Sequence, residues 1–346
     1  MLYLVFSLYV GCAYVFLHIF VAYMILDVAR HKLPEAVTTL VIIALATVVC
    51  NIAMPMSEAT TTTAPLGIAI AEFQQSHNII SALLGFVLIF RLSMMVTRTA
   101  VRSHLYDVNS FGAMSIVPLA IMVLITPNDA LSTIIVAMLA VEAMRRLFYA
   151  FSSEQRMNAI FTAMLAMGAM PLMDSALFVV ILALPLIIVA LRCSLRDLII
   201  AVVGMVLPIF IYAYVVWCSG GAFTDTIAML YHNMLEPSQL SMQTYLSTPR
   251  VAALSLLLFI GVCSVALYAS KSRSLKPATR HIWDFMVSTV VLLGAALMLL
   301  PSTTATSMAV VAIVVSTMAP MLFLRLGTPL AVLLYVTLAT ISVVAM

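Results

Sequence analysis

Residues 158–191, NAIFTAMLAMGAMPLMDSALFVVILALPLIIVAL, contain one charged side chain, Asp174, in an otherwise apolar tract. As a single helix the tract would be about 51 Å long at 1.5 Å per residue, whereas the core of a bilayer is about 30 Å thick. Pro171 and Asp174 therefore predict a tight turn between two short spans, with the carboxylate at the membrane surface. Asp174 also stands before Ser175-Ala176, where a helix N-cap is expected.

The composition of the whole chain indicates a membrane protein. Hydrophobic residues fill 64% of the 346 positions and charged residues only 8%, and the mean hydropathy is +1.19. Soluble domains carry about 25% charged residues, so this chain has too little polar surface for water. We expect an all-α, polytopic helical bundle that forms one integral membrane domain over 1–346. The first apolar stretch is expected to be a retained span rather than a cleaved signal peptide.

The lengths of the apolar stretches predict the number of spans. A helix needs about 20 apolar residues to cross the bilayer core, and this rule predicts about 12 spans. They are 2–26, 36–54, 78–97, 111–126, 131–148, 158–173, 175–191, 198–217, 251–269, 282–300, 307–324 and 327–346.

The basic residues predict the orientation, because Lys and Arg concentrate in cytoplasmic loops. Fourteen of the 16 Lys and Arg residues fall in alternate connections, and the intervening connections are acidic. The exceptions are Arg91, inside the third span, and Arg250, at the start of the ninth. The alternation predicts an N-out, C-out bundle in a bacterial inner membrane. Trp217 and Trp283, near span ends, are expected in interfacial aromatic belts.

Two of the predicted outer loops are long, and long loops tend to carry function. One is 55–77, which contains a threonine run. The other is 218–250, in which we expect a juxtamembrane helix near 222–235. No soluble domain is expected in either loop.

Carboxylates on the predicted outer face are candidates for chemistry. A transferase needs a general base to take a proton from an acceptor hydroxyl, and a divalent cation would need oxygen ligands. Glu58 and Glu72 are the candidate catalytic residues, and Asp174 and Glu236 are candidate substrate contacts. The structural alternative is that Asp129 and Asp174 are N-caps and the glutamates are solvated loop residues.

Arg250 is the only basic residue on the predicted outer face. Arginine offers paired donors to a phosphate, so Arg250 is a candidate contact for a lipid-linked phosphate, together with His232 and Tyr231 of the juxtamembrane helix. The alternative for Arg250 is an anchor at the membrane interface.

Three ionisable residues, His18, Arg91 and Glu142, lie inside predicted spans, where such groups are often functional. Arg91 can reach the inner surface, and His18 can hydrogen-bond to a neighbouring helix. Glu142 is followed by Arg145 and Arg146 at i+3 and i+4, so a local ion pair accounts for it.

Other residue types indicate no further chemistry. The five cysteines form no C-x-x-C pair and the six histidines are scattered, so we expect neither a disulfide framework nor a metal motif. No cofactor is expected, although a divalent cation could bridge the outer carboxylates and an anionic donor. The net charge of +3 reflects loop asymmetry and does not indicate nucleic acid.

Residues 110–236 resemble a family of polytopic bacterial inner-membrane proteins of unknown function. The resemblance is carried by a basic turn, an "NAxF" helix and an "SLRD…G…P" helix: Arg145–Phe148, Gln155–Phe161, Arg192–Asp197 and Gly204–Pro208. That family implies a helical membrane fold but no chemistry.

A second similarity is to multispan glycosyltransferases of the GT-C type, which use polyprenyl-phosphate sugars. Its parallels are the small-residue hairpin Asn158–Gly168, the span end Leu207–Phe210, and the helix from Phe223 to His232. This resemblance implies a polyprenyl-phosphate-linked substrate at the outer face. The chain departs from the pattern in its short first outer loop, and in Asp174, where some members of that class have a lysine.

Three functions follow as hypotheses, with a GT-C-like transferase at the outer face as the primary prediction and the other two as alternatives. A GT-C-like transferase requires residues 55–77 and 218–250 to meet above one cavity open to lipid. A transporter or lipid flippase requires a polar cavity between bundles, and the prolines that interrupt spans (Pro118, Pro185 and Pro320) are compatible with it. A non-catalytic assembly subunit requires an exposed small-residue helix face. Ala163, Ala166 and Ala169 indicate close packing, which fits either such a face or an internal contact.

Overall fold

The computed structural model describes residues 33–53, 64–106, 110–126, 128–152, 156–191, 193–235, 248–300 and 302–345. These segments are almost entirely helical and contain no strand, which confirms the expected all-α fold. Six of the described helices are long and apolar enough to cross a membrane, as expected for a multispan membrane protein. The span 2–26 and the residues His18, Glu58 and Glu236 lie outside the described residues.

Each predicted span from residue 36 onward overlaps one helix or two consecutive shorter helices. The helices are α2 (Leu33–Ala53), α3 (Pro65–Ser76), α4 (Asn78–Arg102), α5 (Ala113–Leu124), α6 (Ala130–Ser152), α7 (Arg156–Ala169), η2 (Met170–Leu172), η3 (Ser175–Leu182), α8 (Ala183–Leu191), α9 (Leu195–Cys218), α10 (Phe223–Leu235), α12 (Thr248–Lys271), η4 (Ser272–Ser274), α13 (Pro277–Leu299), α14 (Ala305–Met318), α15 (Pro320–Phe323) and α16 (Thr328–Ala345). Apart from the 21-residue α2, the remaining helices are too short or too charged to count as spans by themselves, so twelve crossings stay a prediction.

The break predicted within 158–191 is confirmed. Helix α7 ends at Ala169, and Asp174 caps η3 by accepting a hydrogen bond from the Ala176 backbone N–H at 3.1 Å. The carboxylate of Asp174 is nevertheless fully buried instead of solvated at the surface. The reason is tertiary, because Thr304 at the start of α14 donates a hydrogen bond to it.

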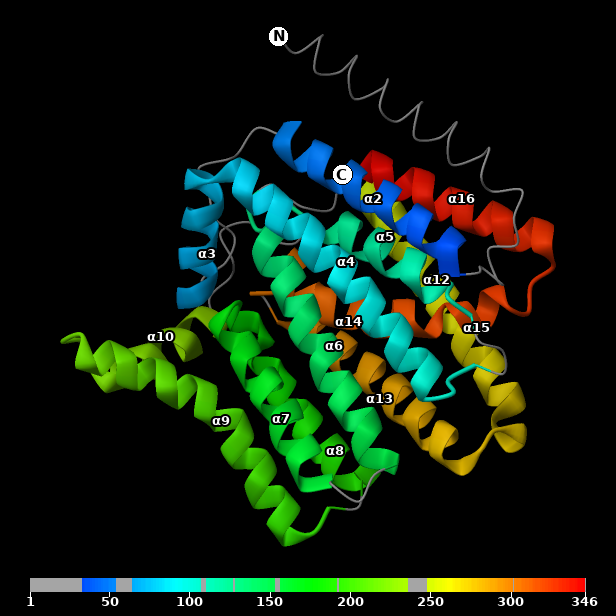
Figure 1. The fold of residues 1–346 in the computed structure, drawn as a ribbon. Coiled ribbons are helices and arrows are strands. Elements are labelled where there is room, and N and C mark those ends of the chain that lie inside the picture. The colour runs from blue at the N-terminus through cyan, green and yellow to red at the C-terminus, as the bar shows by residue number, and fades with distance from the viewer. Residues whose placement is uncertain are drawn as a thin grey trace.

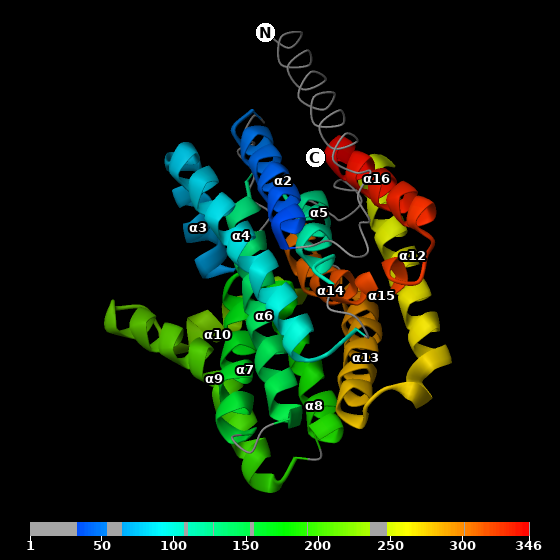
Figure 2. The same cartoon turned by 45° about the vertical axis from the view of Figure 1, so that its right-hand side comes forward.

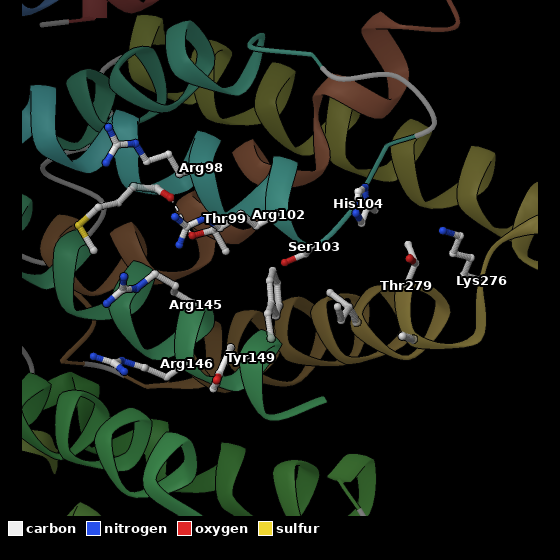
Figure 3. A pocket seen from close by; sticks show the side chains of 14 residues that line it. Arg98, Thr99, Arg102, Ser103, His104, Arg145, Arg146, Tyr149, Lys276 and Thr279 are labelled. Carbon is white, nitrogen blue, oxygen red and sulfur yellow. Dashed lines mark hydrogen bonds between the residues drawn. The ribbon is translucent and has the colours of Figure 1, made fainter. Parts of the chain in front are cut away.

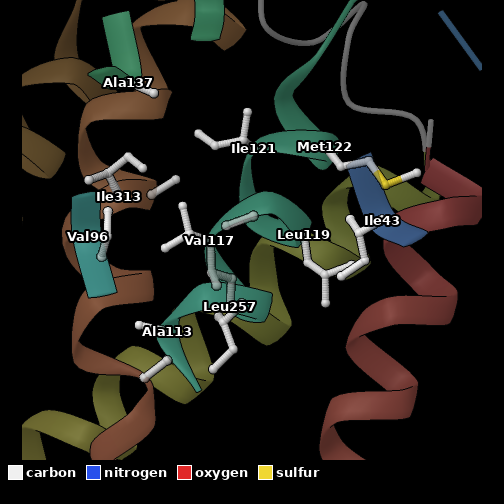
Figure 4. Packing of buried hydrophobic residues seen from close by; sticks show 14 of the residues in the cluster. Ile43, Val96, Ala113, Val117, Leu119, Ile121, Met122, Ala137, Leu257 and Ile313 are labelled. Carbon is white, nitrogen blue, oxygen red and sulfur yellow. The ribbon is translucent and has the colours of Figure 1, made fainter. Parts of the chain in front are cut away.

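Helix α14 occupies the centre of the bundle (Figures 1 and 2), and every residue of Ala305–Phe323 except Ala305 and Val311 is buried. A helix that is apolar on all sides needs such a position. Helix α14 contributes side chains to two hydrophobic clusters. Ile313 belongs to the cluster around α5, and Val314 to the cluster around α7, α8 and α13. Figure 4 shows the first cluster, in which Ile313 and Val117 lie among residues of α2, α4 and α12.

Helix α9 stands at one edge of the bundle and packs tightly against α7 (Figure 1). A Cβ atom at Gly168 would lie 2.0 Å from the carbonyl oxygen of Met205, so only glycine allows this approach. On the same helix, Ala163 and Ala166 are buried. This small-residue face therefore makes an internal contact and is not the exposed face that the assembly hypothesis requires.

The two tryptophans differ from each other. Trp217 at the end of α9 is 56% exposed, which fits an aromatic belt, whereas Trp283 is fully buried. The expectation of a belt position for Trp283 is wrong. Its ring stacks on Tyr268 of α12, and its Nε1–H donates to the carbonyl oxygen of Leu105 at 3.1 Å. Trp283 therefore packs α13 against α12 and against the loop after α4.

Connections of like charge meet at the same end of the bundle. At one end, Gln74 accepts a hydrogen bond from the Leu131 backbone N–H at 3.1 Å, and Thr304 donates to Asp174. We call this the acidic end. At the other, Arg102, Arg146 and Lys276 line one cavity, and we call it the basic end. This grouping agrees with the predicted alternation, and the side of the membrane that each end faces stays a prediction.

Candidate functional site: an arginine pocket at the basic end

The outer-face candidates lie on several elements at the acidic end. Glu72 is on the exposed side of α3, and Tyr231 and His232 are exposed on α10. The two long loops do meet, because Ala64 beside α3 and Leu230 of α10 are buried in one small cluster with Leu172.

Arg250 makes a structural contact. Its Nε–H donates to the carbonyl oxygen of Ala345 at 2.9 Å, so it joins the start of α12 to the last turn of α16. Cationic side chains commonly satisfy the final carbonyls of a helix in this way. Neither Arg250 nor Glu72 lines any of the cavities described below.

The acidic end is a buried layer of hydroxyl groups around one carboxylate. Thr304 caps α14 in a reciprocal pair with Ser307, and the hydroxyls of Thr133 and Thr306 lie 2.9 Å apart. Burial raises the pKa of the Asp174 carboxyl to about 6, although hydrogen bonds from Thr304 and from backbone N–H groups act in the opposite direction. Across the described residues, no three His, Cys, Asp or Glu side chains gather around a metal position.

The basic end contains the strongest candidate site, a cavity of about 490 Å³ that we call the arginine pocket. Figure 3 shows it between the ends of α4, α6 and α13. Its charged and ionisable lining residues are Arg98, Arg102, His104, Arg145, Arg146 and Lys276. Hydroxyl side chains, among them Thr99 and Tyr149, and apolar side chains such as Ile282 complete the walls.

Helix geometry places the arginines. Arg98 and Arg102 are four residues apart in the last turns of α4, so they share one face. Arg145 and Arg146 lie near the corresponding C-terminal end of α6, which runs in the same direction as α4. Lys276 precedes Pro277, the first residue of α13, where proline is favoured because no backbone N–H is needed.

The loop after α4 is held in a defined path at the pocket mouth. The Leu105 N–H bonds to the carbonyl of Ala100 at 3.1 Å and the His104 N–H to that of Val101 at 3.2 Å, which is a Schellman C-cap. His104 occupies the left-handed position with φ 48°, where glycine is usual. The buried Trp283 ring bonds to Leu105, and this contact fixes the loop to α13.

The pocket carries unbalanced positive charge. Glu142 accepts hydrogen bonds from Arg145 at 2.6 Å and Arg146 at 2.8 Å, which confirms the predicted local ion pair. In the described part of the chain, Arg98, Arg102 and Lys276 make no hydrogen bond or ion pair through their side chains. Like charges held close together raise the free energy of the site until an anion joins them.

A second cavity of about 510 Å³ is an open groove between α8 and α13. Its walls are mostly apolar, with Pro185 and Val189 on one side. Its carboxylate, Asp284, already accepts a hydrogen bond from Tyr268 at 2.5 Å. The groove is therefore a poorer candidate for binding an ionic ligand.

In the sequence, the pocket arginines indicate orientation, and Arg145 and Arg146 also predict an ion pair with Glu142, but no single one of them indicates a binding site. A usable signal was present, because Arg98 and Arg102 have helical spacing and Arg145-Arg146 stand at the same end of a neighbouring span. It was not decisive, since the sequence does not say that α4, α6 and α13 are adjacent.

Comparison with known proteins adds no relative: no family model, curated protein or solved structure matches this chain. Neither of the two resemblances described above is tested by these comparisons.

Proposed function

We propose that this chain is a transporter or lipid flippase that binds the phosphate-bearing head group of a lipid-linked substrate in the arginine pocket. The observation that carries the proposal is the pocket itself, with five Lys and Arg side chains around about 490 Å³. Guanidinium groups present paired donors that match the geometry of phosphate oxygens. In this proposal the membrane is a bacterial inner membrane, and the basic end faces the cytoplasm.

The chemistry of the lining favours binding over conversion. A transferase or hydrolase needs a group that can accept a proton in the transition state. The carboxylate that contacts the pocket arginines, Glu142, already accepts from two guanidinium groups. The pocket is thus equipped to hold an anion and lacks an available carboxylate base in the described part of the chain, which leaves the imidazole of His104 as the candidate proton acceptor.

Interrupted helices support transport as well. Helix α14 ends at Met318 and α15 starts at Pro320, and Pro118 lies inside the buried helix α5. Discontinuous helices around a central site recur in transporters, because they can shift as short rigid pieces.

The test is a scrambling assay. The protein is reconstituted into liposomes that contain a fluorescent polyprenyl phosphate, and an impermeant quencher reports how fast the inner-leaflet label becomes accessible. Wild-type protein should give a faster rate than protein-free liposomes. The double variant Arg98→Gln with Arg102→Gln should lower this rate, because its head-group affinity should fall by about 100-fold or more when two charged hydrogen bonds of about 1.5–3 kcal/mol each are lost.

The control is Arg273→Gln, which removes an exposed charge from the neighbouring connection outside the pocket. It should behave as wild type. Equal rates for wild type and protein-free liposomes, or an undiminished rate in the Arg98/Arg102 double variant, would contradict the proposed function.

A GT-C-like transferase at the acidic end is the second candidate, favoured by the contact of Ala64 with the α10 residue Leu230. In it Glu58 or Glu72 would be the base, and Arg250 and His232 would contact the donor phosphate, with Asp174, Tyr231 and Glu236 as further substrate contacts. Single Glu58→Gln, Glu72→Gln and Arg250→Gln variants should then change the lipid-linked glycans of the membrane. If all three insert normally and leave the glycans unchanged, this candidate is wrong.

A further inference from the structure

The arginine pocket has two positively charged halves. Figure 3 shows the four arginines at one end of the cavity, and His104 and Lys276 at the other, with Ser103 between them. The halves come from different elements: α4 and α6 supply the arginine half, and the loop after α4 and the start of α13 supply the other.

The charge count exceeds what one phosphate requires. Five Lys and Arg side chains line the pocket, and Glu142 offsets one of them, so four positive charges remain among the described residues. A terminal phosphate carries about −1.5 to −2 at neutral pH. A single phosphate in the arginine half would leave about two positive charges among the described residues uncompensated, that of Lys276 among them.

Lys276 stands where local electrostatics disfavour a cation. It is the residue before the first turn of α13, and the N-terminus of a helix carries about half a positive charge. Its side chain is exposed and has no partner in the described part of the chain. A second anionic group in this half would offset the repulsion between Lys276 and the positive N-terminus of α13. It would itself be attracted by that helix terminus.

We propose that the arginine pocket recognises a diphosphate, with one phosphoryl group in the arginine half and the linked one beside Lys276. This inference rests on the proposed function, because it specifies the ligand class of the same pocket. It places Lys276 as the residue that separates diphosphates from monophosphates, whereas Arg98 and Arg102 serve both.

The experiment compares four probes on the purified full chain in detergent at low salt: inorganic phosphate, pyrophosphate, geranylgeranyl phosphate and geranylgeranyl diphosphate. Each diphosphate should bind about 10- to 100-fold more tightly than its monophosphate, the effect of one further charged hydrogen bond. Lys276→Gln should remove that ratio, and should weaken diphosphate binding at least about 10-fold more than monophosphate binding. Lys276→Arg should restore it.

The outcomes separate the two proposals. If phosphate and pyrophosphate bind equally well to wild type, the diphosphate inference is wrong while phosphate recognition stands. If none of the four probes binds, the proposed function fails with it. If Lys276→Gln weakens both classes equally, Lys276 does not discriminate and the inference is again wrong.

The prenyl probes also identify the source of the ligand. Tighter binding of geranylgeranyl diphosphate than of pyrophosphate indicates a lipid, whose chain adds apolar contact beside side chains such as Ile282. Equal binding of the two indicates that a water-soluble diphosphate is the ligand. The melting temperature of each variant checks that the exposed substitutions leave the fold intact.

Discussion

At the acidic end, Asp174, Thr304 and Ser307 are buried and bonded to one another, whereas at the basic end Arg98 and Lys276 are exposed and face a cavity. Among the described residues, most buried polar groups of the acidic end bond to one another, with Ser302 Oγ as an exception, because unpaired polar groups away from water are costly. The basic end leaves charge for something else to neutralise. Basic residues in the connections of a membrane protein can therefore mark a binding site as well as the orientation of the chain.

The largest loss of stability is expected from a substitution in the buried hydrogen-bond network of the acidic end. Thr304→Val removes the N-cap of α14 and the hydroxyl that donates to the buried Asp174 carboxylate. We expect a loss of about 3 kcal/mol in stability, from the lost cap and the unsatisfied buried group together. Thermal unfolding in detergent measures it.

The matched control is Thr337→Val on the exposed face of α16, which should unfold close to wild type. Phosphate binding should be the same in both variants once they are folded. Equal melting temperatures for Thr304→Val and Thr337→Val would contradict this account of the buried network.

The pH dependence of stability sharpens the same comparison. The folded pKa of Asp174, about 6, lies above its ordinary value of 3.8, so the ionised form is disfavoured in the fold. The associated stability is fully present below pH 4 and is lost as the pH rises through 6, a change of about 3 kcal/mol in total. Wild type should therefore melt at a higher temperature at pH 5 than at pH 8.

Asp174→Asn should abolish that pH difference, because the amide keeps an acceptor for the Ala176 N–H and cannot ionise. Asp225→Asn, which changes an exposed carboxylate on α10, should keep it. A wild-type melting temperature that is higher at pH 8 than at pH 5 would contradict the predicted direction of the pH dependence.

At the basic end, Glu142→Gln should increase the affinity of the arginine pocket for an anionic ligand. The substitution removes the negative charge that holds Arg145 and Arg146, so more positive charge is available to a ligand. We expect about three- to tenfold tighter binding of pyrophosphate at low salt, an advantage that shrinks as salt screens the charges. Isothermal titration at two salt concentrations measures both, and weaker binding in the variant would mean that Glu142 orients the arginines for the ligand.

The smallest effect concerns the loop after α4. His104→Gly keeps the left-handed cap and should be more stable than His104→Ala by about 1 kcal/mol, because alanine strains that backbone. Both variants remove the imidazole from the pocket. Chemical unfolding of the two measures the cap, and identical stability would show that the Schellman geometry contributes nothing.

Much of the fold was predictable because apolar lengths and breaks are local properties. The break near Pro171 follows from the length of 158–191, and the ion pair of Glu142 follows from helical spacing. The buried positions of Trp283 and Asp174 were missed, because they depend on Leu105 and Thr304, which are distant in sequence. The glycine at 168 looked like one small residue among several, and only the approach of Met205 makes it indispensable.

By itself the sequence determined a helical membrane protein with alternating charge in its connections, because hydropathy and the cost of burying charge act residue by residue. Only the tertiary structure decided which connections meet. Packing α4, α6 and α13 around the central helix brings Arg98, Arg146 and Lys276 to one cavity, and the same packing closes the acidic end over Asp174. The physical reason is that a site is a set of side chains adjacent in space, and helix packing, unlike hydropathy, joins residues that are far apart in the chain.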